Sequence, residues 1–222
     1  MIEVKVESFM KNVLCYILVF AYIFIILGIS GLLKKKKILS DEGNRKLVHI
    51  LVSGAYIIMY KVIYININII IIPLLFAIIN YISNKKNIFK GMEISTRKSY
   101  GTVYYPISMA IMATITYFKP EFYPYYGIGL FIMAFADGFA PIIGNKIKSK
   151  KVLNTDKTVV GSITVFIISI IVIVIFNRIF NLELELFKIL ILGIYSTAVE
   201  LVSSKYDNLL LPLATSLLAY FI

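Results

Sequence analysis

Asp137 is the residue whose chemistry fits least well with its surroundings. It lies in the segment Phe-Ala-Asp137-Gly-Phe-Ala, inside an apolar stretch over 125–144 that contains no lysine or arginine. A carboxylate in hydrocarbon is costly and is usually retained for a function, although a buried ion pair with another helix is the structural alternative. A basic loop and the segment Asp156-Lys157-Thr158 follow. An acid close to cations and hydroxyls suits a metal ion and a phosphate group.

A second polar segment, Lys157-Thr158-Val-Val-Gly161-Ser162, begins the next apolar stretch. Thr158 and Ser162 are one helical turn apart, and they lie at the positive end of the helix dipole. Gly161 leaves room for a ligand or another helix to come close. The segment therefore suits phosphate binding, but a capped helix with an interfacial lysine explains it equally. It is not a Walker A loop, whose glycine spacing is missing.

Two more polar segments begin apolar stretches nearer the N-terminus. Arg45, Lys46 and His49 can share one helical face, where they could grip a phosphate, with His49 as a hydrogen-bond donor or proton relay. Interfacial anchoring of the two cations is the structural alternative. Gly101 and Thr102 start a helix whose backbone amides could hold an anion, or simply form its cap.

The last polar group surrounds the junction between the two final apolar stretches. Glu200, Asp207 and Asn208 offer oxygen ligands of the kind that Mg²⁺ prefers. A polar turn explains Asp207 and Asn208 without a ligand, whereas Glu200 lies deeper in its stretch. Asn145 ends the stretch that contains Asp137 and is a further candidate for nucleotide binding.

Composition predicts the elements that must position these residues. Hydrophobic residues make up 59% of the 222 residues, and the mean hydropathy is +0.87. We therefore expect an all-α, polytopic transmembrane helix bundle of about seven to eight spans that forms a single integral membrane domain over 1–222. The single cysteine, Cys15, excludes an internal disulfide and a Cys/His zinc cluster. The expected spans are 13–33, 47–61, 65–82, 102–118, 125–144, 159–176, 187–202 and 209–222.

The net charge of +11 is distributed unevenly between the loops. Of the 23 lysines and arginines, 17 lie on one side of the expected spans. They occupy residues 34–46, 85–98, 146–157 and 205. The positive-inside rule makes this side cytoplasmic and places both termini outside. The charge thus indicates topology and attraction to anionic lipid in a cell membrane, and not nucleic-acid binding.

The candidate polar residues also fall on the predicted cytoplasmic side. They come from five separate segments, and in a compact bundle they can converge on one site. We therefore expect a site that faces the cytoplasm, where nucleotides are found.

In order along the chain, these segments resemble the phytol kinase and dolichol kinase family. The resemblance covers about residues 41–215, with residues 1–40 as an additional N-terminal helix and basic loop. It rests on the ordered set Arg45-Lys-x-x-His49, Gly101-Thr-x-Tyr-Tyr-Pro106, Ala136-Asp-Gly-Phe-Ala-x-x-x-Gly144, Lys157-Thr-x-x-Gly-Ser162, Glu200 and Asp207-Asn-x-x-x-Pro212. The resemblance implies a membrane kinase that transfers the terminal phosphoryl group of a nucleotide, typically CTP, to a lipid alcohol such as phytol, another isoprenoid alcohol, dolichol or diacylglycerol.

The resemblance and the chemistry of phosphoryl transfer together assign roles to the residues. Mg²⁺ is assigned to Asp137 with Asp207 or Glu200, and Asp137, Asp207 and His49 are the candidate bases. The residues assigned to the nucleotide are Arg45, Lys46, Gly101, Thr102, Asn145, Lys157, Thr158, Gly161, Ser162 and Asn208. The chain departs from many relatives at Pro141, where they carry a polar residue, and at Gly144-Asn-Lys-Ile-Lys, where they carry Gly-Arg-x-x-Gly.

Three functions other than a kinase fit parts of the same pattern. A CDP-alcohol phosphotransferase needs an acid three residues before Asp137, where this chain has Ala134. A cytidylyltransferase acting on a lipid phosphate remains the enzymatic alternative. A small transporter is the non-enzymatic one, but its polar residues would lie near the middle of the membrane, often at broken helices.

Overall fold

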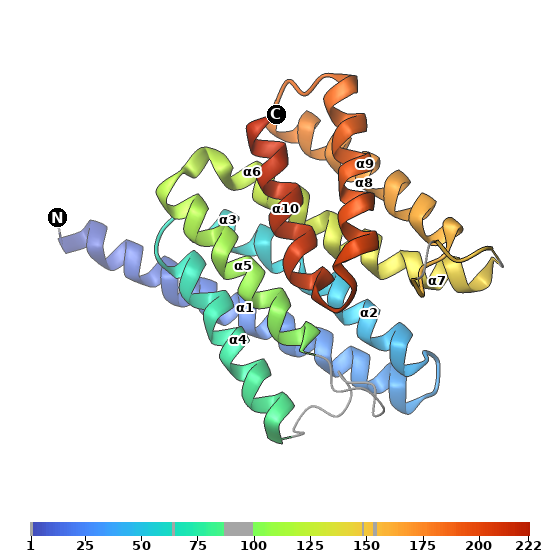
Figure 1. Ribbon diagram of the computed structural model, residues 1–222. Coiled ribbons are helices and arrows are strands. Elements are labelled where there is room, and N and C mark those ends of the chain that lie inside the picture. Colours follow the sequence, from blue (N-terminus) through green and yellow to red (C-terminus); the bar gives the residue numbers. More distant parts are fainter. Residues whose placement is uncertain (1, 64, 87–99, 148, 153–154) are drawn as a thin grey trace. The chain divides into compact units, whose positions relative to one another are not determined.

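The described part of the chain is helical. The computed structural model describes residues 2–63, 65–86, 100–147, 149–152 and 155–222. These residues form helices and turns, together with one isolated antiparallel bridge between Lys151 and Thr158. The all-α class is therefore confirmed (Figure 1). The chain divides into two compact units, residues 1–120 and residues 121–222. The expected single domain stays a prediction.

Unit 1 (residues 1–120) is built from long helices that are linked by polar as well as apolar contacts. α1 packs against α2 and α3, and α4 packs along α5. Tyr16 of α1 donates a hydrogen bond of 2.8 Å to Asn68 Oδ1 of α4, and Phe20 stacks on Phe76 at 4.7 Å between ring centroids. The helices of its described residues are α1 (Ile2–Lys35), α2 (Asp41–Val52), α3 (Ala55–Ile63), α4 (Asn68–Lys86) and α5 (Gly101–Phe118).

The expected span 47–61 is divided in the structure between α2 and α3. The break falls at Ser53 and Gly54, where Tyr22 of α1 donates a hydrogen bond of 2.7 Å to the backbone carbonyl of Leu51. A side chain at Gly54 would collide with the Tyr22 hydroxyl. This long-range contact satisfies a carbonyl at the helix end, which the local apolar pattern does not reveal.

Unit 2 (residues 121–222) is a cluster of helices around an apolar core. α6 packs against α10 and α8, α7 against α8, and α9 against both α8 and α10. Leu130, Ile173, Leu192 and Leu211 come from four of these helices and are fully buried. After the 3₁₀ turn Pro120–Phe122, its elements are α6 (Tyr123–Ile132), the π-helical segment η2 (Met133–Asp137), α7 (Gly138–Lys146), α8 (Val159–Phe180), α9 (Leu186–Ser203), the 3₁₀ turn η3 (Ser204–Tyr206) and α10 (Asp207–Phe221).

The π-helical segment interrupts the expected span 125–144 between α6 and α7. A π turn shifts the backbone hydrogen bonds by one residue, and such segments are frequent at functional sites. Asp137 is the last residue of this segment. The sequence pattern predicted a continuous helix here and did not indicate the π turn.

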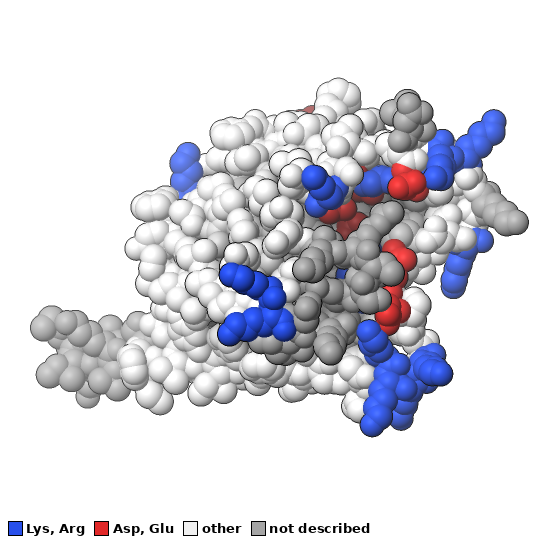
Figure 2. Space-filling view, turned by 60° about the horizontal axis from the view of Figure 1, so that its bottom comes forward, with Lys and Arg blue, Asp and Glu red and all other residues white. Residues whose placement is uncertain are grey.

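The outer surface has the character of a membrane protein. The described residues include five stretches that are long and apolar enough to cross a membrane: Phe9–Lys35, Asn68–Lys86, Pro120–Lys146, Val159–Phe180 and Leu186–Phe221. Large apolar side chains recur on the exposed face of α8 at Ile163, Ile167, Ile171, Ile175 and Ile179. Figure 2 shows a broad uncharged surface, with the charged side chains gathered in a few groups. Seven to eight spans and an outside N-terminus stay predictions.

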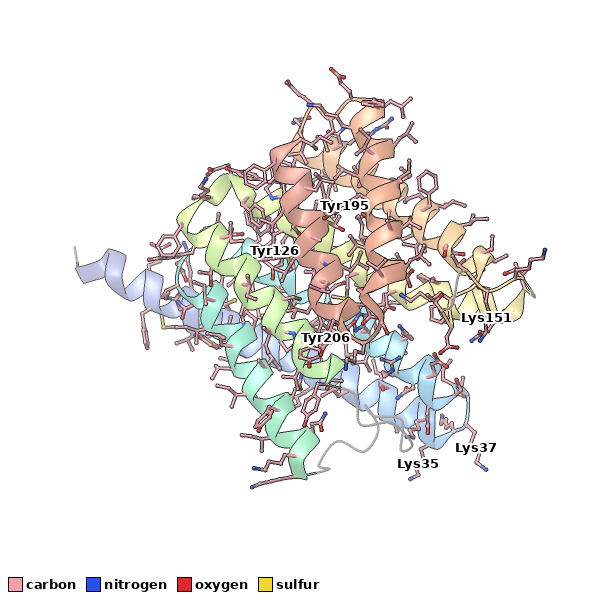
Figure 3. The ribbon with its side chains drawn as sticks, in the orientation of Figure 1. Lys35, Lys37, Tyr126, Lys151, Tyr195 and Tyr206 are labelled. Carbon is pink, nitrogen blue, oxygen red and sulfur yellow. The ribbon has the colours of Figure 1, made fainter. Side chains whose placement is uncertain are left out.

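Lysines mark the end of the first apolar stretch. Lys35 and Lys37 lie at the C-terminal end of α1 and just beyond it (Figure 3). Lys34 pairs with Asp41, the first residue of α2, at 2.9 Å. A basic loop at this point agrees with an interfacial position. Four other basic residues of the predicted cytoplasmic side, Lys90, Arg97, Lys98 and Lys148, lie outside the described residues.

Candidate functional site

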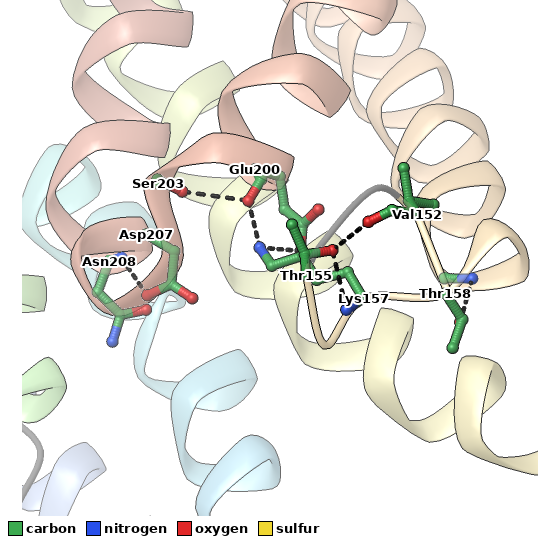
Figure 4. Close-up of polar contacts among 9 residues, drawn as sticks. Val152, Thr155, Lys157, Thr158, Glu200, Ser203, Asp207 and Asn208 are labelled. Carbon is green, nitrogen blue, oxygen red and sulfur yellow. Dashed lines mark hydrogen bonds and ion pairs between the residues drawn. The ribbon is translucent and has the colours of Figure 1, made fainter. Parts of the chain in front are cut away.

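The best-defined polar contact in unit 2 joins Lys157 to Glu200. Lys157 Nζ lies 2.6 Å from Glu200 Oε1 and also donates to the backbone carbonyl of Glu200 (Figure 4). Glu200 is buried in the last turn of α9, whereas Lys157 lies just before α8 and is partly exposed. Burial makes the pairing necessary, because an unpaired carboxylate in this position would be costly. The contact fixes one cation at the start of α8.

The segment before α8 is folded so that Lys157 faces α9. The Lys157 carbonyl accepts a hydrogen bond of 2.8 Å from Val152 N. The Lys157 amide donates to Thr155 Oγ1 at 3.2 Å, and that hydroxyl donates to the carbonyl of Val152 at 2.7 Å (Figure 4). Together with the Lys151–Thr158 bridge, these bonds make a tight turn that sets the direction of the lysine backbone.

The first turn of α8 has a cap, which was the structural alternative to phosphate binding at this segment. Thr158 is the N-cap, and its hydroxyl accepts a hydrogen bond of 3.1 Å from Gly161 N. α7 comes very close here: a Cβ added to Gly144 would lie 2.5 Å from Thr158 Oγ1, and one added to Gly161 would lie 3.4 Å from the Ala140 carbonyl. The two glycines therefore serve helix packing, and the Thr158 hydroxyl is engaged as a cap.

Asp137 is buried, with 7% of its surface exposed. It ends the π-helical segment, and the next helix, α7, is the one that packs on the start of α8. Asn145 lies near the other end of α7 and is exposed. The structure thus places an acid inside unit 2 and an amide at its surface, on the same short helical stretch.

Glu200, Asp207 and Asn208 lie around the corner between α9 and α10. The Ser203 hydroxyl donates to the Glu200 carbonyl at 3.3 Å, and Asn208 N donates to Asp207 Oδ1 at 2.8 Å (Figure 4). Ser204 turns the chain with φ 47° and ψ −118°, a conformation that a residue with a side chain rarely adopts. The two acids therefore lie on either side of a strained turn, and not on one continuous helix.

The candidate residues of unit 1 lie on α2 and α5. Lys46 and His49 are buried, and the His49 ring lies 4.5 Å from the Tyr105 ring, whose hydroxyl donates to the His49 carbonyl at 3.4 Å. Arg45 Nε is buried without a hydrogen-bond partner among the described residues. The backbone carbonyl of Thr102 accepts a hydrogen bond of 2.8 Å from Asn80 Nδ2 of α4.

Arg45, Lys46, His49, Gly101 and Thr102 thus belong to unit 1, whereas the other candidates belong to unit 2. Their convergence on one site stays a prediction. The structure adds one relationship that the sequence did not predict, because it pairs Lys157, assigned to phosphate, with Glu200, assigned to metal. The sequence did contain a signal for this pair, because Lys157 and Glu200 are opposite charges at the ends of two apolar stretches.

The donor set can be tested against Mg²⁺. No group of three or more His, Cys, Asp or Glu side chains is placed to hold a metal ion within the ranges that the structure describes. Mg²⁺ does not require such a group, because it commonly binds through one or two carboxylates together with substrate phosphates and water. The assignment of Mg²⁺ to Asp137 with Asp207 or Glu200 stays a prediction.

The described residues form a helical protein with five stretches that are long and apolar enough to cross a membrane. A comparison with protein-family models found no match, and comparisons with curated proteins and with solved structures found none either. The kinase resemblance therefore depends on the order and spacing of the motifs in the sequence.

Proposed function

We propose that this chain is a membrane kinase that transfers the terminal phosphoryl group of CTP, or of another nucleoside triphosphate, to the hydroxyl of a lipid alcohol. The observation that carries the proposal is the polar interior of unit 2. A buried acid, Asp137, and an ion pair between the buried Glu200 and the partly exposed Lys157 lie within a unit whose exposed faces are largely apolar. Charges buried inside a membrane protein are generally retained for a function.

The residues of unit 2 suit the binding of phosphates at the start of α8. Lys157 supplies a cation there, and the dipole of α8 adds partial positive charge. The hydroxyl of Ser162, one turn into the helix, has no hydrogen-bond partner among the described residues. Asp137 and Asp207 would hold Mg²⁺, which neutralises charge on the phosphates.

The reaction depends on the positioning of the nucleotide and the alcohol more than on covalent participation of the protein. The alcohol oxygen forms a bond to the terminal phosphorus, while the bond from that phosphorus to the bridging oxygen breaks and the nucleoside diphosphate leaves. The alcohol proton passes to a base, for which Asp137, Asp207 and His49 are the candidates. Because the transition state of phosphoryl transfer is loose, the proton moves late and a strong base is not required.

The test is a transfer assay with the purified, full-length protein. Terminally labelled nucleoside triphosphates are incubated with phytol, farnesol, a polyprenol and diacylglycerol, with and without Mg²⁺. A labelled lipid phosphate together with a nucleoside diphosphate supports the kinase. Release of pyrophosphate from CTP and a lipid phosphate supports a cytidylyltransferase instead, and no transfer to any alcohol contradicts the proposal.

A further inference from the structure

Two hydroxyls on α8 are buried without a hydrogen-bond partner among the residues that the structure describes. They belong to Ser162 and Ser169. Ser169 has no exposed surface, and it lies midway along the helix with isoleucines on both sides. A buried polar group without a partner lowers stability, so its presence needs an explanation.

Three other buried hydroxyls in unit 2, those of Thr164, Ser196 and Thr215, have hydrogen-bond partners. Thr164 donates to the Val160 carbonyl one turn earlier at 2.9 Å. Ser196 donates to the Leu192 carbonyl at 2.7 Å, and its oxygen lies 3.2 Å from the hydroxyl of Thr215. Bonding to the carbonyl four residues earlier is the usual way for a serine in an apolar helix to satisfy its hydroxyl. Ser162 and Ser169 differ from this pattern.

The two unpartnered hydroxyls share one face of α8. Ser162 and Ser169 are seven residues apart, which is close to two helical turns. Phe176 lies a further seven residues on, and its ring contacts Phe131 of α6 at 5.5 Å between centroids. The face that carries the hydroxyls is therefore the face directed at the α6–η2–α7 stretch. We call these two residues the hydroxyl stripe.

The contacts of α8 show which residues of the α6–η2–α7 stretch lie opposite the hydroxyl stripe. Gly161 approaches Ala140 of α7, whereas Phe176 meets Phe131 of α6, so the two stretches run antiparallel. The middle of α8 then lies opposite the residues between Phe131 and Ala140. That interval contains the π-helical segment Met133–Asp137, which also contacts α8. The hydroxyl stripe thus faces the part of unit 2 that holds its buried acid.

We propose that Ser169, the deeper member of the hydroxyl stripe, binds the alcohol group of the lipid substrate and is a specificity-determining residue. In naming the ligand, the inference rests on the proposed function. A serine both donates and accepts a hydrogen bond, as an alcohol does. A phosphate would need a cation at this depth, and within α8 the only basic residue is Arg178, in the last turn.

The experiment compares Ser169→Ala with Ser196→Ala in the full-length protein. The probe is an isoprenoid alcohol that carries a photoactivatable diazirine, and cross-linked peptides are identified by mass spectrometry. For Ser169→Ala we expect about tenfold weaker cross-linking and a KM for the alcohol about tenfold higher, as loss of one good hydrogen bond implies. The KM for the nucleotide stays unchanged, and the melting temperature in detergent is equal to that of the wild type or higher.

Ser196→Ala is the matched control, because it removes a buried serine hydroxyl that already has partners. It should lower the melting temperature and leave cross-linking per folded molecule unchanged. Cross-linking in Ser169→Ala that equals the wild type, or a wild type that is not labelled on α8 or η2, overturns the inference. Labelling that depends on Ser169 without any phosphoryl transfer would leave the binding site standing and reject the kinase.

Discussion

Lys157 and Glu200 form an ion pair of 2.6 Å between residues that are 43 positions apart in the chain. The pair connects the turn before α8 to the last turn of α9. The side chain of Glu200 is 7% exposed and that of Lys157 is 23% exposed, so both charges are largely removed from water. The pair therefore positions the lysine that we assign to phosphate binding.

Loss of the lysine should destabilise the protein strongly. Lys157→Met leaves the buried Glu200 carboxylate without its partner, and we expect a loss of about 3 kcal/mol or more. The measurement is thermal unfolding in detergent, followed by circular dichroism. Lys151→Met is the control, because the Lys151–Asp156 pair is exposed and should contribute less than about 1 kcal/mol. Equal losses in the two variants would contradict the importance of burial.

Replacing Asp137 by Asn should abolish phosphoryl transfer and leave the fold intact. The amide has the shape of the carboxylate but no charge for a metal ion, and we expect activity to fall by at least about 100-fold. Thermal unfolding in detergent shows whether the variant keeps the fold. Asp156→Asn, at a position that is 91% exposed on its side chain, should retain full activity. Near-normal turnover in Asp137→Asn would reject the metal assignment.

Gly129 should not tolerate an alanine. A Cβ there would collide with the Ser216 hydroxyl and with the backbone carbonyl of Pro212, so α6 and α10 would have to separate. We expect Gly129→Ala to cost about 1–3 kcal/mol, measured as a fall in the melting temperature. Gly28→Ala is the control, since nothing lies within 4 Å of an added Cβ and alanine is the better helix former. A loss as large for Gly28→Ala would mean that close packing is not the cause.

Strain at Ser204 should be relieved by glycine. With φ 47° and ψ −118°, the serine occupies a region that is open mainly to glycine, so Ser204→Gly should raise stability by about 1 kcal/mol. Asn181→Gly is the comparison. Asn181 has φ 49° and ψ 53°, a left-handed conformation that asparagine accepts, so glycine has little strain to relieve there. Chemical or thermal unfolding in detergent measures both. A loss of stability in Ser204→Gly would show that its side chain contributes more than the strain costs.

The predicted topology can be tested with single cysteines. Cys15 is buried and is the only cysteine in the sequence, so a Cys15→Ala background carries no reactive thiol. A cysteine at Lys36 should react with a membrane-impermeant maleimide only after the cells are opened, because the positive-inside rule places this loop in the cytoplasm. A cysteine at Lys119 should react in intact cells. The reverse labelling pattern would invert the orientation.

The apolar stretches of the sequence predicted most of the helices to within a few residues, because each stretch is a local property of the chain. The expected spans 102–118 and 187–202 correspond closely to α5 and α9. The pattern failed at Gly54, where a tyrosine from α1 reaches a helix end, and at the π-helical segment Met133–Asp137. Both deviations depend on packing between helices, which a local pattern does not encode.

The sequence by itself determined that the chain is helical with stretches apolar enough to cross a membrane, and which of its charged and polar residues are expensive to bury. The cost of burying a residue depends on that residue and its immediate neighbours, so the sequence alone identified Asp137 and Glu200 as costly to bury. Only the tertiary structure decided which partners these residues find. It paired Lys157 with Glu200 and left Ser169, opposite the segment that ends in Asp137, without a hydrogen-bond partner in the described part of the chain. Such relationships join positions tens of residues apart, and they arise from the geometry with which the helices pack.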